Sequence, residues 1–121
     1  MSSMHLAAAG AVVLLLAAAS ACDPERKQEC EHFSAAMKPL DQGTPSADAV
    51  DRVRTQVERL NLQDQTLGIY AKNYTQTLTV LASTLRLKAD PGAPDGTDDV
   101  IKTRLKAART DADDVTRFCA E

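Results

Sequence analysis

Cysteine and histidine supply most of the reactive side chains in this sequence of 121 residues, which contains three cysteines and two histidines. The cysteines are Cys22, Cys30 and Cys119, and the histidines are His5 and His32. Metal and redox sites built on cysteine need pairs at short spacing, such as Cys-x-x-Cys, and the sequence contains no such pair. We therefore expect no metal site, no redox-active dithiol and no cofactor.

His32 is the only histidine after residue 21, and acidic and polar residues surround it in the sequence. Nucleophilic catalysis needs a histidine that contacts a nucleophile and is oriented by a carboxylate, and no local pattern suggests this arrangement. His32 and Met37 are five residues apart on one predicted helix, so they point in different directions and cannot bind one haem iron. We interpret His32 as a solvent-exposed residue and expect that the protein is not an enzyme.

Several aspartates lie close together between residues 90 and 99. If Gly96 stood at the sixth position of a calcium-binding loop, the first and third positions would be Pro91 and Ala93, which have no side-chain oxygen. We therefore predict that these aspartates belong to a turn and to the start of a helix, not to a cation site. Thr97 or Asp95 is the expected N-cap of that helix.

The first 21 residues contain no Asp, Glu, Lys or Arg, so the 14 basic and 17 acidic residues all lie in the remainder of the chain. The apolar run over residues 6–19 is shorter than the roughly 20 residues that span a bilayer, and it has the length of a signal-peptide core. This run ends at Ala19-Ser20-Ala21-Cys22. The tetrapeptide resembles the lipobox of bacterial lipoprotein precursors.

The resemblance covers residues 1–23 and does not extend to the fold that follows. It implies that residues 1–21 are a cleaved signal peptide, that Cys22 is lipidated, and that residues 22–29 form the lipid attachment and a short tether. Because two or more acyl chains give stable anchoring, we expect the protein to be exported and held by this lipid on a bacterial membrane. The periplasmic face of the inner or outer membrane and the cell surface all fit. The alternative is an ordinary secretory signal, with Cys22 left as a thiol.

An exported protein folds in an oxidising compartment, where an odd number of cysteines leaves one thiol to be explained. Lipidation of Cys22 accounts for that thiol and leaves Cys30 and Cys119 as a pair. We therefore predict a disulfide between them. Because it closes a long loop, it is worth up to roughly 4–5 kcal/mol in the chain-entropy model. Phe33 and Phe118 lie close to these cysteines in the sequence, and we expect them to shield the bond.

Apolar residues recur every three or four positions after residue 23, which predicts an all-α fold with helices over about 24–38, 45–60, 64–89 and 97–119. Asp23, Thr44 and Asp64 are the expected N-caps of the first three helices. The second and third apolar stripes share one heptad frame, so a three-helix bundle with one long middle helix is the alternative. Asn61 and Asp64 favour a break between them. The stripes are Cys30, Phe33, Met37 and Leu40; Val50, Val53, Val57 and Leu60; Leu67, Ala71, Tyr74, Leu78, Leu81 and Leu85; and Ile101, Leu105, Ala108, Ala112, Val115 and Cys119.

We predict that residues 30–121 form one domain, a small four-helix bundle with up-down-up-down topology. In this topology the first and last helices place Cys30 and Cys119 near the same end. The loops that contain Gly43 and Gly92 are then expected at the opposite end.

The composition argues against nucleic-acid binding, because the net charge is −3, tryptophan is absent and only four residues are aromatic. The leading hypothesis is a lipid-anchored helical module of the bacterial cell envelope with a structural or protein-interaction role. Its expected partners are the membrane, through Cys22, and an envelope protein. The alternative is a lipoprotein that binds a small ligand between its helices. A buried pocket lined by Tyr70 and Tyr74 would favour that alternative.

Overall fold

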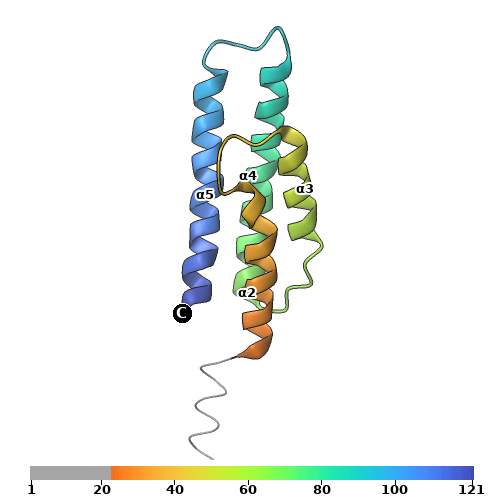
Figure 1. Ribbon diagram of the computed structural model, residues 1–121, viewed down its shortest axis with the longest axis vertical. Helices are drawn as coiled ribbons and strands as arrows, with labels where there is room; N and C mark the ends of the chain where they lie inside the picture. The colour runs from red at the N-terminus through yellow and green to blue at the C-terminus, as the bar shows by residue number, and fades with distance from the viewer. Residues whose placement is uncertain (1–22) are drawn as a thin grey trace, which may run out of the picture.

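The computed structural model describes residues 23–121, which form four α-helices and a short 3-10 helix. The helices are α2 (Pro24–Met37), α3 (Ala47–Glu58), α4 (Gln65–Ala89) and α5 (Thr97–Ala120), and the 3-10 helix η1 (Lys38–Leu40) follows α2 directly. Successive helices run in opposite directions and pack side by side (Figure 1). The predicted all-α bundle of four helices with up-down-up-down topology is confirmed.

The third helix begins at the predicted break. Asp64 is the N-cap of α4, and its carboxylate accepts a hydrogen bond of 3.0 Å from the backbone N–H of Leu67. The linker before it is attached to α2, because the Glu29 carboxylate accepts hydrogen bonds from the backbone N–H groups of Gln63 (2.7 Å) and Asp64 (3.1 Å). The alternative with one long middle helix is therefore wrong.

The second helix is shorter than predicted, and its N-cap is Ser46 instead of Thr44. The Ser46 hydroxyl accepts a hydrogen bond of 3.1 Å from the N–H of Ala49, and the extended backbone of Ser46 keeps Pro45 outside the helix. With 12 residues, α3 is about half as long as α4, which has 25. The predicted position of the Gly43 loop is consequently wrong, because this loop lies part-way along the α4–α5 hairpin and only the Gly92 loop lies at its far end (Figure 1).

The predicted N-cap of the last helix is also wrong. Gly96 occupies the N-cap position with a φ of 87°, a left-handed conformation that glycine adopts without a steric penalty. The Thr97 hydroxyl does not cap the helix, because it donates a hydrogen bond of 2.6 Å to the carbonyl of Pro94 in the preceding turn. Asp98 and Asp99 do lie in the first turn of α5, where the helix dipole favours negative charge.

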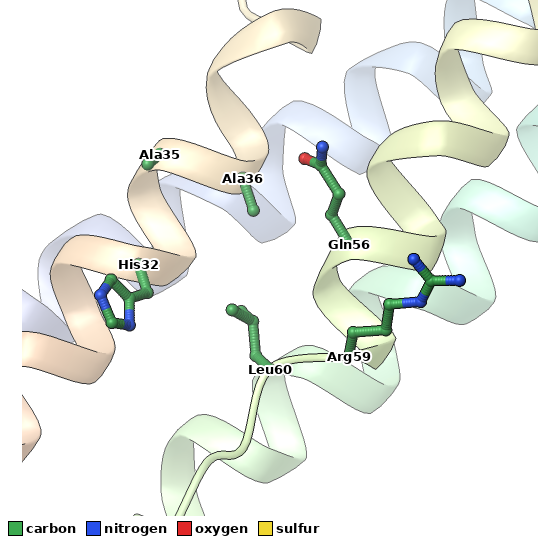
Figure 2. A pocket seen from close by; sticks show the side chains of 6 residues that line it. All are labelled: His32, Ala35, Ala36, Gln56, Arg59 and Leu60. Atoms are coloured by element: carbon green, nitrogen blue, oxygen red, sulfur yellow. The ribbon is translucent and has the colours of Figure 1, made fainter.

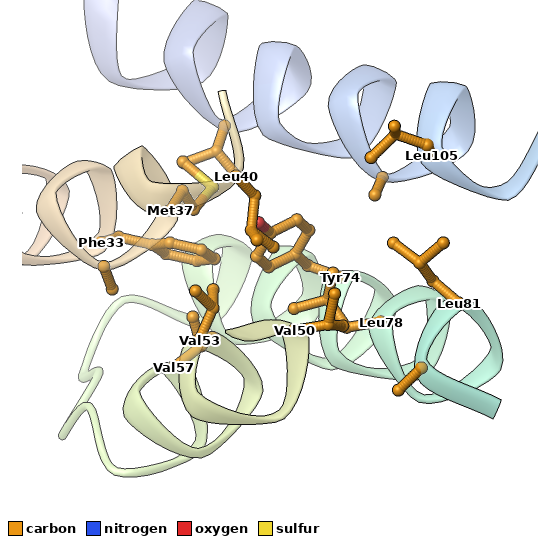
Figure 3. Close-up of a cluster of buried hydrophobic side chains, with 14 of the residues drawn as sticks. Phe33, Met37, Leu40, Val50, Val53, Val57, Tyr74, Leu78, Leu81 and Leu105 are labelled. Atoms are coloured by element: carbon orange, nitrogen blue, oxygen red, sulfur yellow. The ribbon is translucent and has the colours of Figure 1, made fainter. Parts of the chain in front are cut away.

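The predicted apolar stripes face one another and form a single core, apart from Ile101, which is buried outside this cluster (Figure 3). Tyr74 and Phe33 are the largest side chains in it, and their ring centroids are 6.2 Å apart. Ala36 and Ala82 are buried as well, which the stripes did not include. The largest side chains with less than 2% of their surface exposed are Phe33, Val50, Val53, Val57, Leu67, Tyr74, Leu78, Leu81 and Val115.

Glu29 offers a test of how α2 is joined to the α3–α4 linker. We expect Glu29→Ala to lower the free energy of unfolding by about 1–2 kcal/mol, because it removes an anionic acceptor from two backbone N–H groups. The control is Glu31→Ala, since Glu31 is exposed and makes no hydrogen bond or ion pair with any residue in 23–121. Urea denaturation measures both effects, and an equal loss in the two variants would contradict this role of Glu29.

Candidate functional site

The predicted lipidation site, Cys22, and the predicted signal peptide lie outside the residues that the structure describes. The described chain begins at Asp23, which is the N-cap of α2 and accepts hydrogen bonds from the N–H groups of Glu25 (3.0 Å) and Arg26 (3.4 Å). Asp23 is the only residue between Cys22 and the first helical residue, Pro24. Any group attached to Cys22 is therefore tied closely to the start of α2.

The predicted disulfide between Cys30 and Cys119 is confirmed. It joins α2 to the last turn of α5, spans 89 residues of sequence and has a Cα–Cα distance of 5.8 Å. The start of α2 and the end of α5 consequently lie at the same end of the bundle (Figure 1). We call this the closed end of the molecule.

Arg26 makes a second connection between these two helices. Its guanidinium lies 4.0 Å from the ring centroid of Phe118 and donates a hydrogen bond of 2.9 Å to the Phe118 carbonyl. This carbonyl belongs to the last turn of α5 and also accepts a hydrogen bond of 3.3 Å from the backbone N–H of Glu121. On its other side, Phe118 packs against Tyr70 of α4, with ring centroids 5.6 Å apart. Three helices therefore meet at the disulfide.

The phenylalanines on either side of the disulfide have separate partners. Phe33 is fully buried against Tyr74, whereas Phe118 is half-buried between Arg26 and Tyr70. The cystine itself is largely covered, because Cys30 is 7% exposed and Cys119 is half-buried. A covered disulfide is typical of structural cross-links rather than of redox-active ones.

Tyr70 and Tyr74 do not line a common ligand pocket. The cavity beside Tyr74 has a volume of only about 10 Å³, which is room for about one water molecule. Tyr74 is 1% exposed, and burial raises the pKa of its phenol well above 10.0, with the carboxylates of Asp41 and Asp111 adding to the shift. Tyr74 is therefore a neutral core residue at all physiological pH values.

Two larger openings among the described residues are grooves on the surface. One has a volume of about 410 Å³ and lies between α2 and the end of α3, with His32 on one wall, Arg59 on the other and Leu60 between them (Figure 2). The other, about 440 Å³, lies between the end of α3 and α4 beside Lys72. His32 is exposed, as predicted, and forms no hydrogen bond within residues 23–121. Both grooves are open to solvent, so neither has the shape of a site that encloses its ligand.

The aspartates between residues 90 and 99 interact with different partners. Asp90 accepts a hydrogen bond of 3.0 Å from the N–H of Gly92 within the turn. Asp98 forms an ion pair of 2.6 Å with Lys88, and the hydrogen bond from Lys88 holds the pKa of the Asp98 carboxyl below its usual value. Over residues 23–121, no three histidine, cysteine or acidic side chains are grouped so that they could hold a metal ion.

Comparison with family models, curated proteins and solved structures gave no match to this chain. From Asp23 to the C-terminus, none of the helices combines the length and the apolar character that crossing a membrane requires.

Removing the disulfide should destabilise the bundle substantially. We expect Cys30→Ala/Cys119→Ala to lower the free energy of unfolding by about 2–5 kcal/mol, because the unfolded chain regains the freedom of a long loop. Urea denaturation with and without dithiothreitol provides the check. Reductant should bring the wild type to the stability of the double variant and leave that variant unchanged, whereas an insensitive wild type would contradict the prediction.

Tyr74 should make stability depend on pH in the alkaline range. Because the folded-state pKa lies above the unfolded value of 10.0, the phenol's contribution is complete below pH 10 and falls as the pH rises further. We expect Tyr74→Phe to lose less stability than the wild type between about pH 10 and 12. Tyr70→Phe, which changes the half-buried tyrosine, is the control, and identical pH profiles for wild type and Tyr74→Phe would refute the prediction.

Proposed function

We propose that this protein is a lipid-anchored helical module of the bacterial cell envelope with a structural or protein-interaction role and no catalytic activity. In this proposal, residues 1–21 are a cleaved signal peptide and Cys22 carries the lipid. The support from the sequence is the tetrapeptide Ala19-Ser20-Ala21-Cys22 at the end of an apolar run. Lipidation of Cys22 also accounts for the odd cysteine, because the other two of the three cysteines form one intramolecular disulfide.

The observation that carries the proposal is the closed end of the bundle. Asp23 alone separates Cys22 from α2, so a lipid on Cys22 would hold this end directly at the membrane surface. The disulfide then connects the anchored helix to α5. The bundle would be attached through a cross-linked end rather than through a helix that could detach from its neighbours.

The small-ligand alternative receives less support. A small-molecule site normally encloses most of its ligand and has a volume of about 300–1,000 Å³. The cavity at Tyr74 is about 10 Å³, and the two larger spaces are open surface grooves. A role in contacts with other proteins is favoured for this reason.

Lipidation can be tested by changing the acceptor cysteine. We expect Cys22→Ala to abolish the lipid and release the protein from the membrane fraction, because the remaining bundle has no acyl chains to hold it there. Intact-mass analysis of the membrane fraction should show an acylated N-terminal cysteine in the wild type and in Cys30→Ala/Cys119→Ala, but not in Cys22→Ala. A wild-type protein without any acyl group would overturn the proposal.

A further inference from the structure

The outward surface of α4 lacks charged side chains over most of its length. Between Gln65 and Leu85 the only charged residue of this helix is Lys72. Six exposed residues separated by four, three, four, three and four positions form one line along the surface, which we call the α4 stripe. Its residues are Ile69, Asn73, Gln76, Val80, Ser83 and Leu87.

The α4 stripe contains three of the four large apolar side chains that are most exposed in the described chain. Ile69 is 62% exposed, Val80 is 41% exposed and Leu87 is 45% exposed. An exposed apolar residue on its own is ordinary, but these three share one face of one helix with uncharged residues between them. The face is therefore suited to contact with another surface.

None of the other helices in residues 23–121 covers the α4 stripe. The side of α4 toward α3 is marked by the ion pair between Arg86 and Asp51. The side toward α5 is marked by the hydrogen bond of 2.7 Å from Thr77 to Asp111 and by the ion pair of Lys88. Because the stripe residues lie on neither of these sides and not in the core, they form the remaining, solvent-facing side of the helix.

The spacing of the α4 stripe is that of a helix which packs against another helix at a small crossing angle. The stripe is also complementary to itself. Ile69 and Leu87 lie nine residues before and nine after Leu78, Asn73 and Ser83 lie five before and five after it, and Gln76 and Val80 lie two before and two after it. In an antiparallel pair of α4 helices centred on Leu78, Ile69 would therefore meet Leu87 of the second copy, and Asn73 would meet Ser83.

The charges on the neighbouring helix α5 fit the same axis. The contacts Thr77–Asp111 and Lys88–Asp98 place the α5 residues near position 109 at the level of Leu78. Arg104 and Asp114 lie five residues before and five after position 109. They lie seven residues before and three after Asp111, so both belong to the side of α5 that lies next to α4, beside the α4 stripe.

Arg104 is exposed and forms no ion pair within residues 23–121. In a symmetric pair, Arg104 of each copy would lie level with Asp114 of the other copy, whose carboxylate also forms an ion pair with Arg117 of its own chain. The two-fold axis thus brings Ile69 against Leu87 and Val80 against Gln76 along α4, and opposite charges together along α5. Self-complementarity of both kinds is what an isologous dimer interface requires.

From these observations we infer that two copies of this protein associate through their α4 stripes, antiparallel and about a two-fold axis near Leu78, with Arg104–Asp114 ion pairs between the α5 helices. The stripe is about 27 Å long at 1.5 Å per residue, so the interface belongs to the smaller class of specific contacts. The inference does not depend on lipidation of Cys22. If both copies are anchored to one membrane, their closed ends lie at opposite ends of the pair and the helices run along the surface.

Disulfide trapping between two tagged copies of the full-length chain tests this arrangement in membranes. One copy carries Gln76→Cys and the other Val80→Cys, which the axis places opposite each other. Arg52→Cys and Gln56→Cys form the control pair, because both residues are exposed on α3 and have the same spacing. We expect at least about tenfold more covalent heterodimer from the α4 pair than from the control pair. A tenfold ratio corresponds to a difference of about 1.4 kcal/mol in the free energy of association.

A charge reversal on α5 tests the orientation. Arg104→Glu, added to the α4 cysteine pair, should reduce the cross-linked product by about tenfold, because two attractive pairs become repulsive. Lys106→Glu makes the same change in net charge on the opposite side of α5 and should leave the product unchanged. Circular dichroism of both variants should match that of the parent chain.

Three results would overturn the inference. The first is equal cross-linking of the α4 and α3 pairs. The second is predominant cross-linking of Val80→Cys to a different protein, which would show that another partner covers the stripe. The third is an equal effect of Arg104→Glu and Lys106→Glu. Because cross-linking is scored separately from lipid attachment, loss of the anchor in Cys22→Ala would not be confused with loss of the dimer.

Discussion

The covalent bond between Cys30 and Cys119 holds the first helix of this bundle on the last, and α2 depends on it more than any other helix does. The helices α4 and α5 run beside each other over their full length, and α3 packs along α4 (Figure 1). By contrast, α2 makes far fewer contacts with α3 and α5 than α3 and α5 make with α4, and one of its four buried residues is Cys30 itself. A helix of 14 residues is only marginally stable in water without tertiary contacts. The disulfide supplies stabilisation that the few packing contacts of α2 do not provide.

Two further interactions near the disulfide also hold α2 to its neighbours. Arg26 connects α2 to the final turn of α5, and Glu29 connects α2 to the linker before α4. All three connections lie at the closed end, next to the point where the chain continues to Cys22. In the proposed anchored form, the helix that carries the lipid is thus held to its neighbours by a covalent bond and by two hydrogen-bonding side chains. The exposed α4 stripe remains free for contact with a second copy.

Hydrophobic periodicity was sufficient to predict the number of helices, their order and most of the core, because each helix buries one face. Asp64 is the N-cap of α4, so the strong N-cap in the sequence correctly favoured two helices over one long middle helix. The errors occurred where several local caps compete: Ser46 and Gly96 begin helices that Thr44 and Thr97 were expected to cap. Cysteine parity, given export, predicted the disulfide. The contacts of Arg26 and Glu29 could not be predicted, since they join residues 92 and 34 positions apart through one half-buried charged side chain each.

The central claim is that the disulfide keeps α2 on the bundle, and native-state hydrogen exchange measures this helix by helix. The full-length protein should be compared before and after reduction of Cys30–Cys119, under conditions where it stays folded. We predict that the backbone amides of α2 lose most of their protection on reduction, while those in the middle of α4 and α5 keep theirs. Unchanged protection of α2, or an equal loss in all four helices, would contradict the account.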